Sequence, residues 1–196
     1  MLAPQPNGSQ KVIILTAPSG AGKSSIAKYL LTNYPSLSFS VSATTRAPRG
    51  KEQDGIEYHF ISPAAFEGHI YNNDFLEYEM VYKDVYYGTL SSELTRIWGL
   101  AKTPVLDIDV KGALVVQKKL GMNALSIFIQ PPSIEVLKER LEKRETESPE
   151  AIKIRLAKAN YEMSFSHQFN AIVKNDSLEL ACKEVAMLIE QFLATP

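Results

Sequence analysis

The sequence predicts an α/β fold in which helices cover both faces of a parallel sheet. Short apolar runs rich in β-forming residues alternate with longer amphipathic patterns along most of the chain, as expected for βαβ units. These runs are apolar at nearly every residue, which is typical of strands buried on both faces. The chain has 196 residues, 45% of them hydrophobic, which is enough for one compact core.

The core elements follow one another in a regular order. Strands are predicted over residues 11–16 (KVIILT), 37–42 (LSFSVS), 103–109 (TPVLDID), 124–130 (ALSIFIQ) and 170–175 (NAIVKN). Helices are predicted over residues 24–34 (SSIAKYLLTNY), 112–120 (GALVVQKKL) and 178–193 (LELACKEVAMLIEQFL). Cys182, the one cysteine, lies in the last apolar pattern with no base beside it. We interpret it as a buried core thiol and not as a nucleophile.

Two segments depart from this alternation. Residues 45–89 combine turn signals (APRGKEQDG, YNND) with aromatic alternating segments (IEYHFI, FLEYEMVY, VYYGT), so we expect a small inserted sheet there. Residues 133–165 are charged and helical in pattern. Within them Ser148 is the expected N-cap of a helix, with Pro149 at its first position.

Charge and hydropathy exclude some classes of partner. Lys and Arg number 21 and Asp and Glu 22, giving a net charge of -1, so no overall field favours nucleic acid or an acidic membrane surface. The N-terminus lacks the pattern of a signal peptide, and no segment approaches the roughly 20 apolar residues of a membrane span. We expect a cytoplasmic protein without nucleic acid or membrane partners. The histidines His59, His69 and His167 show no metal-ligand spacing and are interpreted as structural or surface residues.

The stretch TAPSGAGKSS, residues 16–25, connects the first predicted strand to the first predicted helix. This is the context of a phosphate loop of the pattern G-x-x-x-x-G-K-[ST]. Small residues allow consecutive backbone N–H groups to point at phosphate oxygens, and the helix adds its positive end. Lys23 would reach the β- and γ-phosphates of a nucleotide, and Ser24 would offer its hydroxyl to Mg²⁺. The alternative is a glycine-rich turn without a ligand.

The loop departs from the pattern at its first position, where Ala17 replaces glycine. Alanine is tolerated there if its φ is below zero, because glycine then has no steric advantage. Gly20 and Gly22 are the positions expected to require glycine.

Polar residues also lie at or just beyond the carboxyl ends of two other predicted strands. Arg46 and Arg49 flank an Ala-Pro turn in SVSATTRAPRG, and their planar guanidinium groups suit bidentate binding of phosphate. Two exposed loop arginines are the alternative. In VLDIDVKG, Asp107 and Asp109 are two residues apart, so on a strand they share a face near the carboxyl end. Ligands of open α/β sheets gather at that end.

These motifs together resemble guanylate kinases over nearly the whole chain. The resemblance lies in APSGAGKS, SVSATTRAPR with DGIEYHF downstream, DFLEYEMVYKDVYYGT, VLDIDVKG and the final VKND, in the family's order. It implies transfer of the γ-phosphoryl group of ATP to GMP, and also to dGMP, with Mg²⁺ as cofactor. It further implies one domain with three parts: a core (1–44, 90–132 and 166–196), a GMP-binding insert (45–89) and a lid (133–165).

On the ATP side, the resemblance gives catalytic roles to four cations: Lys23, Arg46, Arg144 and Arg155. Such cations stabilise the negative charge that develops on the transferring phosphoryl group. The residues implied to contact ATP are Ala17, Pro18, Ser19, Gly20, Ala21, Gly22, Lys23, Ser24, Ser25, Arg140, Asn175 and Asp176. The last two match a turn that lies beside the adenine in the family, and a simple Asn-Asp turn before the final helix is the alternative. Ser24 and Asp107 are implied to hold Mg²⁺.

On the GMP side, the resemblance places the phosphate against Arg46, Arg49, Tyr58 and Tyr87. The alternative for the two tyrosines is aromatic packing alone. Ser42, Glu77 and Thr89 would face the base, where a carboxylate accepts from guanine N1–H and the amino group and hydroxyls serve O6 and N7. Asp109 would serve the nucleoside, although the roles of Asp107 and Asp109 could be exchanged.

Two other functions are alternatives to this one. Guanylate-kinase-like modules of scaffold proteins bind protein partners without catalysis, but they typically have a damaged phosphate loop, whereas Lys23 and Ser24 are present here. A kinase for another nucleoside monophosphate is disfavoured by the combination of Ser42, Glu77 and Thr89. The sequence therefore favours an active guanylate kinase.

Overall fold

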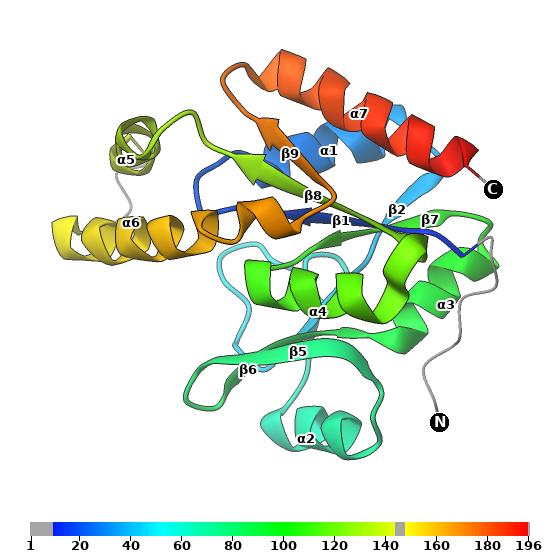
Figure 1. Ribbon diagram of the computed structural model, residues 1–196. Helices are drawn as coiled ribbons and strands as arrows, with labels where there is room; N and C mark the ends of the chain where they lie inside the picture. The colour runs from blue at the N-terminus through cyan, green and yellow to red at the C-terminus, as the bar shows by residue number, and fades with distance from the viewer. Residues whose placement is uncertain (1–9, 144–147, 196) are drawn as a thin grey trace.

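The larger of two sheets forms the centre of the molecule (Figure 1). The computed structural model describes residues 10–143 and 148–195. Five parallel strands lie in the order β2-β7-β1-β8-β9. Their bounds are β1 Val12–Thr16, β2 Leu37–Phe39, β7 Thr103–Asp107, β8 Ala124–Gln130 and β9 Ala171–Lys174. Every residue of β1 is buried, so the predicted parallel sheet, covered on both faces, is confirmed.

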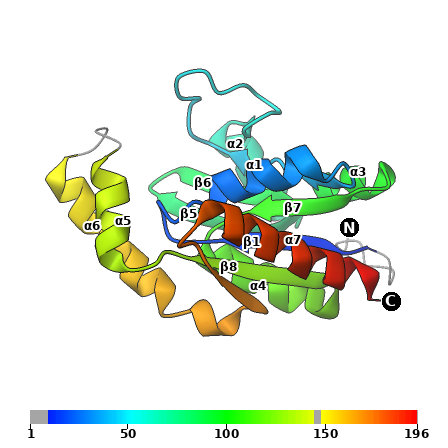
Figure 2. The same ribbon diagram turned by 90° about the horizontal axis from the view of Figure 1, so that it is seen from above.

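Two pairs of helices cover the two faces of this sheet (Figures 1 and 2). Helices α1 (Lys23–Asn33) and α7 (Leu178–Ala194) pack on one face, and α3 (Ser91–Gly99) and α4 (Val110–Leu120) on the other. Cys182 of α7 is 3% exposed within the first of these cores. Its predicted role as a core residue is confirmed.

The insert forms the second, mixed sheet, as predicted, with strand order β4-β3-β6-β5. Its elements are β3 Ala43–Thr44, β4 His59–Phe60, α2 Pro63–Tyr71, β5 Phe75–Tyr82 and β6 Val85–Leu90. Helix α2 was not among the predicted helices. Its start nevertheless carries a recognisable signal, because Ser62 is the N-cap and Pro63 the first helical residue.

The lid segment consists of helices α5 (Ile134–Glu142) and α6 (Pro149–Met163), which project beside the carboxyl ends of the parallel strands (Figure 1). They share a small apolar core of their own. Ser148 caps α6 by accepting a hydrogen bond from the backbone N–H of Ala151 at 3.2 Å, so the predicted cap is confirmed. No helix among the described residues is long and apolar enough to cross a membrane.

Strand order brings the candidate site residues together. Strand β1 lies between β7 and β8, and Leu15 pairs in register with Asp107. The loop after β1 therefore starts beside the carboxyl end of β7, where ligands of such sheets bind. The insert leaves the core after β2 and returns at α3. Glu93 of α3 fixes the outgoing chain, because its carboxylate accepts from the backbone N–H of Val41 at 3.0 Å.

Candidate active site

The phosphate loop, residues 17–25, has the backbone conformation that its glycines predict. Gly20 and Gly22 have φ values of +91° and +96°, a region that side chains other than glycine rarely adopt. Gly22 is also the N-cap of α1. The φ of Ala17 is not positive, and its side chain is buried against the core. These findings agree with the glycine requirements expected from the sequence.

Lys23 joins the phosphate loop to the end of β7. Its Nζ donates to the backbone oxygen of Ile108 at 3.1 Å and forms an ion pair with the carboxylate of Asp107. Both charged side chains are about four-fifths buried, with exposed fractions of 18% and 20%. These two contacts hold the ammonium group between the phosphate loop and the end of β7.

Asn175 contacts the backbone of the phosphate loop. Its side chain is buried, and its Nδ2 donates to the backbone oxygen of Ala21 at 2.7 Å. Arg140 of α5 in turn donates to the backbone oxygen of Asn175 at 3.0 Å. The neighbouring Asp176 is exposed and pairs with Lys174. Within the predicted Asn-Asp turn, the asparagine therefore contacts the loop and the aspartate faces outward.

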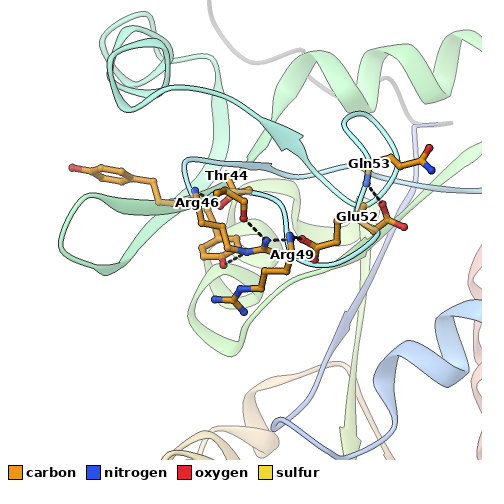
Figure 3. Close-up of polar contacts among 9 residues, drawn as sticks. Thr44, Arg46, Arg49, Glu52 and Gln53 are labelled. Atoms are coloured by element: carbon orange, nitrogen blue, oxygen red, sulfur yellow. Dashed lines mark hydrogen bonds and ion pairs between the residues drawn. The ribbon is translucent and has the colours of Figure 1, made fainter. Parts of the chain in front are cut away.

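The arginine loop, residues 45–58, lies between β3 and β4 of the insert and holds a dense set of polar contacts (Figure 3). The guanidinium group of Arg46 donates to the hydroxyl of Tyr87 at 2.9 Å and pairs with Glu52. It also lies over the ring of Tyr58, 5.0 Å from its centroid. The hydrogen bond from Arg46 lowers the pKa of Glu52 to about 2. Residues far apart in sequence are thus assembled around one guanidinium group.

A buried carboxylate lies between β5, β6 and α4. Glu77 accepts from the hydroxyl of Thr89 at 2.7 Å, and burial raises the pKa of Glu77. A Cβ atom at Gly112 would lie 2.7 Å from Oε2 of Glu77, so this glycine makes room for the carboxylate. The pair of an acidic acceptor and a hydroxyl matches the predicted base-reading set.

Asp107 and Asp109 differ in their local roles. Asp107 ends β7, whereas Asp109 lies beyond the strand as the N-cap of α4 and accepts from the backbone N–H of Gly112 at 2.7 Å. The expectation that both lie on the strand is therefore corrected, because the chain turns into α4 after Asp107. A hydrogen bond with Asp109 raises the pKa of Glu79 to about 7.

The lid segment reaches the phosphate loop through α6. Arg155 donates to the hydroxyl of Ser19 at 2.9 Å. Glu162, about two turns further along α6, is buried and borders the same cleft. Arg144, the other arginine predicted to enter the site from the lid, lies outside the described residues.

A cleft of about 460 Å³ connects these regions. Its walls come from the phosphate loop, the end of β7, the insert and α6. Predicted site residues that line it are Ala17, Pro18, Ser19, Gly20, Gly22, Lys23, Ser24, Ser25, Ser42, Tyr58, Glu77, Tyr87, Asp107 and Asp109. Predicted residues outside this lining are Ala21, Arg46, Arg49, Thr89, Arg140, Arg155, Asn175 and Asp176. Lys23 lines the cleft at the phosphate loop, and the insert lines it with Tyr58 and Tyr87, which Arg46 contacts from behind the lining. Cations at and near both sides of one cleft suit two phosphate-bearing ligands that meet end to end.

Several residues at or near the site were not singled out from the sequence, among them Glu52, Glu79, Gly112 and Glu162. Glu52 and Glu79 act on predicted site residues through side-chain contacts that no local spacing encodes. Gly112 could have been noticed, because it lies three residues after Asp109 in VLDIDVKG and a glycine near a helix start often permits a close approach.

Comparison with known proteins gives a consistent result. The family model described as guanylate kinase matches residues 9–192. The guanylate kinase of Bacteroides thetaiotaomicron is 51% identical over 93% of this chain and 90% of its own. That of Porphyromonas gingivalis is 50% identical over 94% of this chain and 98% of its own. The crystal structure of guanylate kinase from Anaplasma phagocytophilum superposes with a TM-score of 0.76 at 25% identity, covering 96% of this chain and 89% of that one. The chain belongs to the guanylate kinase family.

Proposed function

We propose that this guanylate kinase binds ATP at the phosphate loop and GMP at the insert, and transfers the γ-phosphoryl group between them in the cleft. The products are ADP and GDP. The observation that carries the proposal is that one shared cleft is lined by the phosphate loop on one side and by Tyr58, Glu77 and Tyr87 on the other. Phosphoryl transfer requires that donor and acceptor meet in line, with little covalent help from the protein.

For ATP, we assign the phosphates to the backbone N–H groups of the phosphate loop. The positive φ values of Gly20 and Gly22 support this, because they bend the loop into a concave shape. Lys23 acts on charge that develops on the transferring group, as do Arg155 and Arg144 from the lid. Arg155 already contacts the loop at Ser19, which supports its role. Asn175 and Arg140 hold the loop and the lid in place beside the nucleotide.

For GMP, we assign the phosphate to Arg46, Arg49, Tyr58 and Tyr87. The contact between Arg46 and the hydroxyl of Tyr87 supports this grouping. We assign guanine to Glu77, Thr89 and Ser42. The buried Glu77 carboxylate would accept from N1–H and the amino group of guanine, and adenine would present a lone pair there instead.

The predicted Mg²⁺ fits the donor set, since Ser24 offers a hydroxyl and Asp107 a carboxylate on the cleft. Mg²⁺ prefers such oxygen ligands and is commonly held by one or two carboxylates together with substrate phosphates. When bound it neutralises charge on the phosphates of ATP. In the structure the carboxylate of Asp107 forms an ion pair with Lys23, so it also fixes the position of the lysine side chain of the loop.

We further propose that the insert and the lid segment act as the moving parts of the enzyme. Closure over both nucleotides excludes water, which otherwise accepts the γ-phosphoryl group. The separate sheet of the insert and the separate apolar core of α5 and α6 support this division. We propose that the enzyme acts in the cytoplasm, and we expect dGMP to serve as a second acceptor.

The test is an ADP-release assay with ATP and each of GMP, dGMP, AMP, CMP, UMP and dTMP. A site that pairs its buried polar groups with one base rejects another by roughly 10⁴ to 10⁵ in kcat/KM. We expect turnover with GMP and very poor turnover with AMP. Turnover of AMP or dTMP within about tenfold of GMP would contradict the assignment of the base-reading residues.

A further inference from the structure

Glu52 occupies the centre of the arginine loop (Figure 3). Its two carboxylate oxygens accept from Nη1 and Nη2 of Arg46 at 2.6 and 2.7 Å, a bidentate pair. The oxygen that faces Nη1 also accepts from the backbone N–H of Arg49 at 2.8 Å. One carboxylate therefore fixes both arginines of the proposed phosphate clamp, one by its side chain and the other by its backbone.

The other contacts of Arg46 leave its guanidinium group little freedom. Nε donates to the hydroxyl of Tyr87 and Nη1 also donates to the backbone oxygen of Ala47, both at 2.9 Å. With the two bonds to Glu52, four of the five N–H groups of the side chain have partners. The rings of Tyr58 and Phe60 lie against the group, and the side chain is only 10% exposed. Arg46 is thus locked in one orientation.

This orientation determines how Tyr87 presents its hydroxyl. Because the oxygen accepts from Nε of Arg46, the hydroxyl proton is available for another acceptor. A guanidinium donor also makes the phenol a stronger hydrogen-bond donor. Figure 3 shows the Arg49 guanidinium group directed away from Glu52, so it too remains available to a phosphate.

We propose that Glu52 is a positioning residue for the acceptor substrate: it orients Arg46, Tyr87 and Arg49 so that their donors converge on the phosphate of GMP. This inference rests on the proposed function, which places the GMP phosphate at these residues. Glu52 itself does not contact GMP, and it acts through the guanidinium plane of Arg46 and the backbone at Arg49.

The same contacts allow an opposite role, in which Glu52 takes the place of the phosphate and GMP must displace it. Two observations favour positioning. Displacement of Glu52 would first have to break its bidentate pair with Arg46, whose side chain is only 10% exposed, and breaking such a pair is costly. It would also free the backbone N–H of Arg49, which Glu52 holds together with Arg46. Since the pKa of Glu52 is about 2, protonation does not release the carboxylate at any pH at which the enzyme is assayed.

Steady-state kinetics of Glu52→Gln distinguish the two roles. Glutamine keeps the size of the side chain, but it loses the charge and presents an amide N–H₂ to a guanidinium donor. We expect the KM for GMP to rise about tenfold, because charge-assisted bidentate pairs are among the stronger hydrogen bonds. The KM for ATP should stay within about twofold of wild type, since the phosphate loop is unaffected.

Asp54→Asn is the matched control. Asp54 lies in the same loop, and its carboxylate accepts from the backbone N–H of Phe60 at 2.8 Å. The substitution removes the same charge from the same loop without touching Arg46, so the KM for GMP should change by less than about twofold. A second test places Glu52→Gln in an Arg46→Lys background, where no bidentate fork exists. There Glu52→Gln should have little further effect if Glu52 acts through Arg46.

An unchanged KM for GMP in Glu52→Gln would overturn the proposal, and a lowered KM would show that the carboxylate competes with GMP. An equal rise in Asp54→Asn would also overturn it, because loop charge alone would then explain the effect. If Glu52→Gln fails to fold, Glu52→Asp keeps the charge and loses only reach, and an unchanged KM for GMP in that variant contradicts positioning. Failure of the proposed function is separate, because the wild-type enzyme would then not phosphorylate GMP.

Discussion

The phosphate loop and the arginine loop, the two regions proposed to bind phosphate, are built in different ways. In the phosphate loop, the geometry comes from the main chain: two glycines with positive φ and the start of α1 shape the loop over a few consecutive residues. In the arginine loop, the geometry comes from side chains, with Arg46 held between Glu52 and Tyr87. The φ values of the phosphate loop are set over a few consecutive residues, whereas the arginine loop depends on side-chain contacts that reach across the insert.

This difference determines which changes each region tolerates. A backbone-built loop is sensitive to any side chain added at its glycines and is insensitive to exchanges of outward-facing residues. A side-chain-built loop is sensitive to loss of a single partner in its network, since the remaining polar groups are then left unpaired. The following substitutions test this contrast, beginning with the largest expected effect.

Lys23→Met removes the one cation of the phosphate loop while leaving its backbone geometry in place. We expect kcat to fall by on the order of 10² or more, because the ammonium group acts on charge that develops in the transition state. The KM for GMP should change little, and the protein should remain folded by circular dichroism. A variant with normal kcat and only a raised KM for ATP would show that Lys23 contributes uniform binding.

Glu77→Gln makes the corresponding change on the GMP side. The carboxylate is buried against Thr89, and glutamine removes the charged acceptor for guanine N1–H. We expect kcat/KM for GMP to fall by roughly 10- to 100-fold, the cost of one hydrogen bond to a charged group. ATP binding, measured by calorimetry, should be nearly unchanged. An equal loss of ATP affinity would mean that Glu77 maintains the structure of the cleft and does not bind the guanine base.

Gly22→Ala and Gly50→Ala compare the two loops directly. Both glycines have positive φ, +96° and +58°. A Cβ at Gly22 would lie 2.3 Å from Nδ2 of Asn175, whereas a Cβ at Gly50 meets nothing within 4 Å. We therefore expect Gly22→Ala to lower kcat/KM for ATP about tenfold or more, from displaced loop geometry, and to cost about 2 kcal/mol or more of stability.

Gly50→Ala should carry the backbone cost alone, roughly 1 kcal/mol, with the KM for GMP within about twofold of wild type. Thermal melting and kinetics of the two variants, measured side by side, check both expectations. Equal losses in the two variants would remove the contrast between a backbone-built and a side-chain-built loop.

The same contrast explains what could be predicted from the sequence. The parallel sheet and the glycine positions of the phosphate loop follow from short patterns, because strand burial and positive φ are local properties. The contact of Glu52 with Arg46 could not be predicted, because it depends on how the arginine loop folds back on itself over several residues. The support of the phosphate loop by Asn175 is likewise non-local, since Asn175 is 154 residues from Ala21.

Helix α2 and the position of Asp109 are different cases. The start of α2 carries the Ser-Pro signal that correctly predicted the start of α6, but the aromatic alternation around it favoured strands. Asp109 was expected on a strand because the run TPVLDID is uniformly suited to one. Its carboxylate instead caps α4, and helix capping ended the strand two residues early.

Ala17→Gly is the smallest expected change and the sharpest test of the phosphate loop. Ala17 lies where the family pattern has glycine, yet its methyl group is buried in the core beside β1 and its φ is not positive. Glycine at this position would therefore not improve the geometry of the loop. It would add backbone freedom to the unfolded chain and remove a buried methyl group, so the free energy of unfolding should fall by about 1 kcal/mol. For a chain of this length, that lowers Tm by about 2–4 °C. Because Gly20 and Gly22 already set the orientation of the N–H groups that we propose to bind the phosphates, kcat/KM for ATP should stay within about twofold. A tenfold rise in kcat/KM would mean that the first position limits the loop, and that its geometry is not fixed by the later glycines.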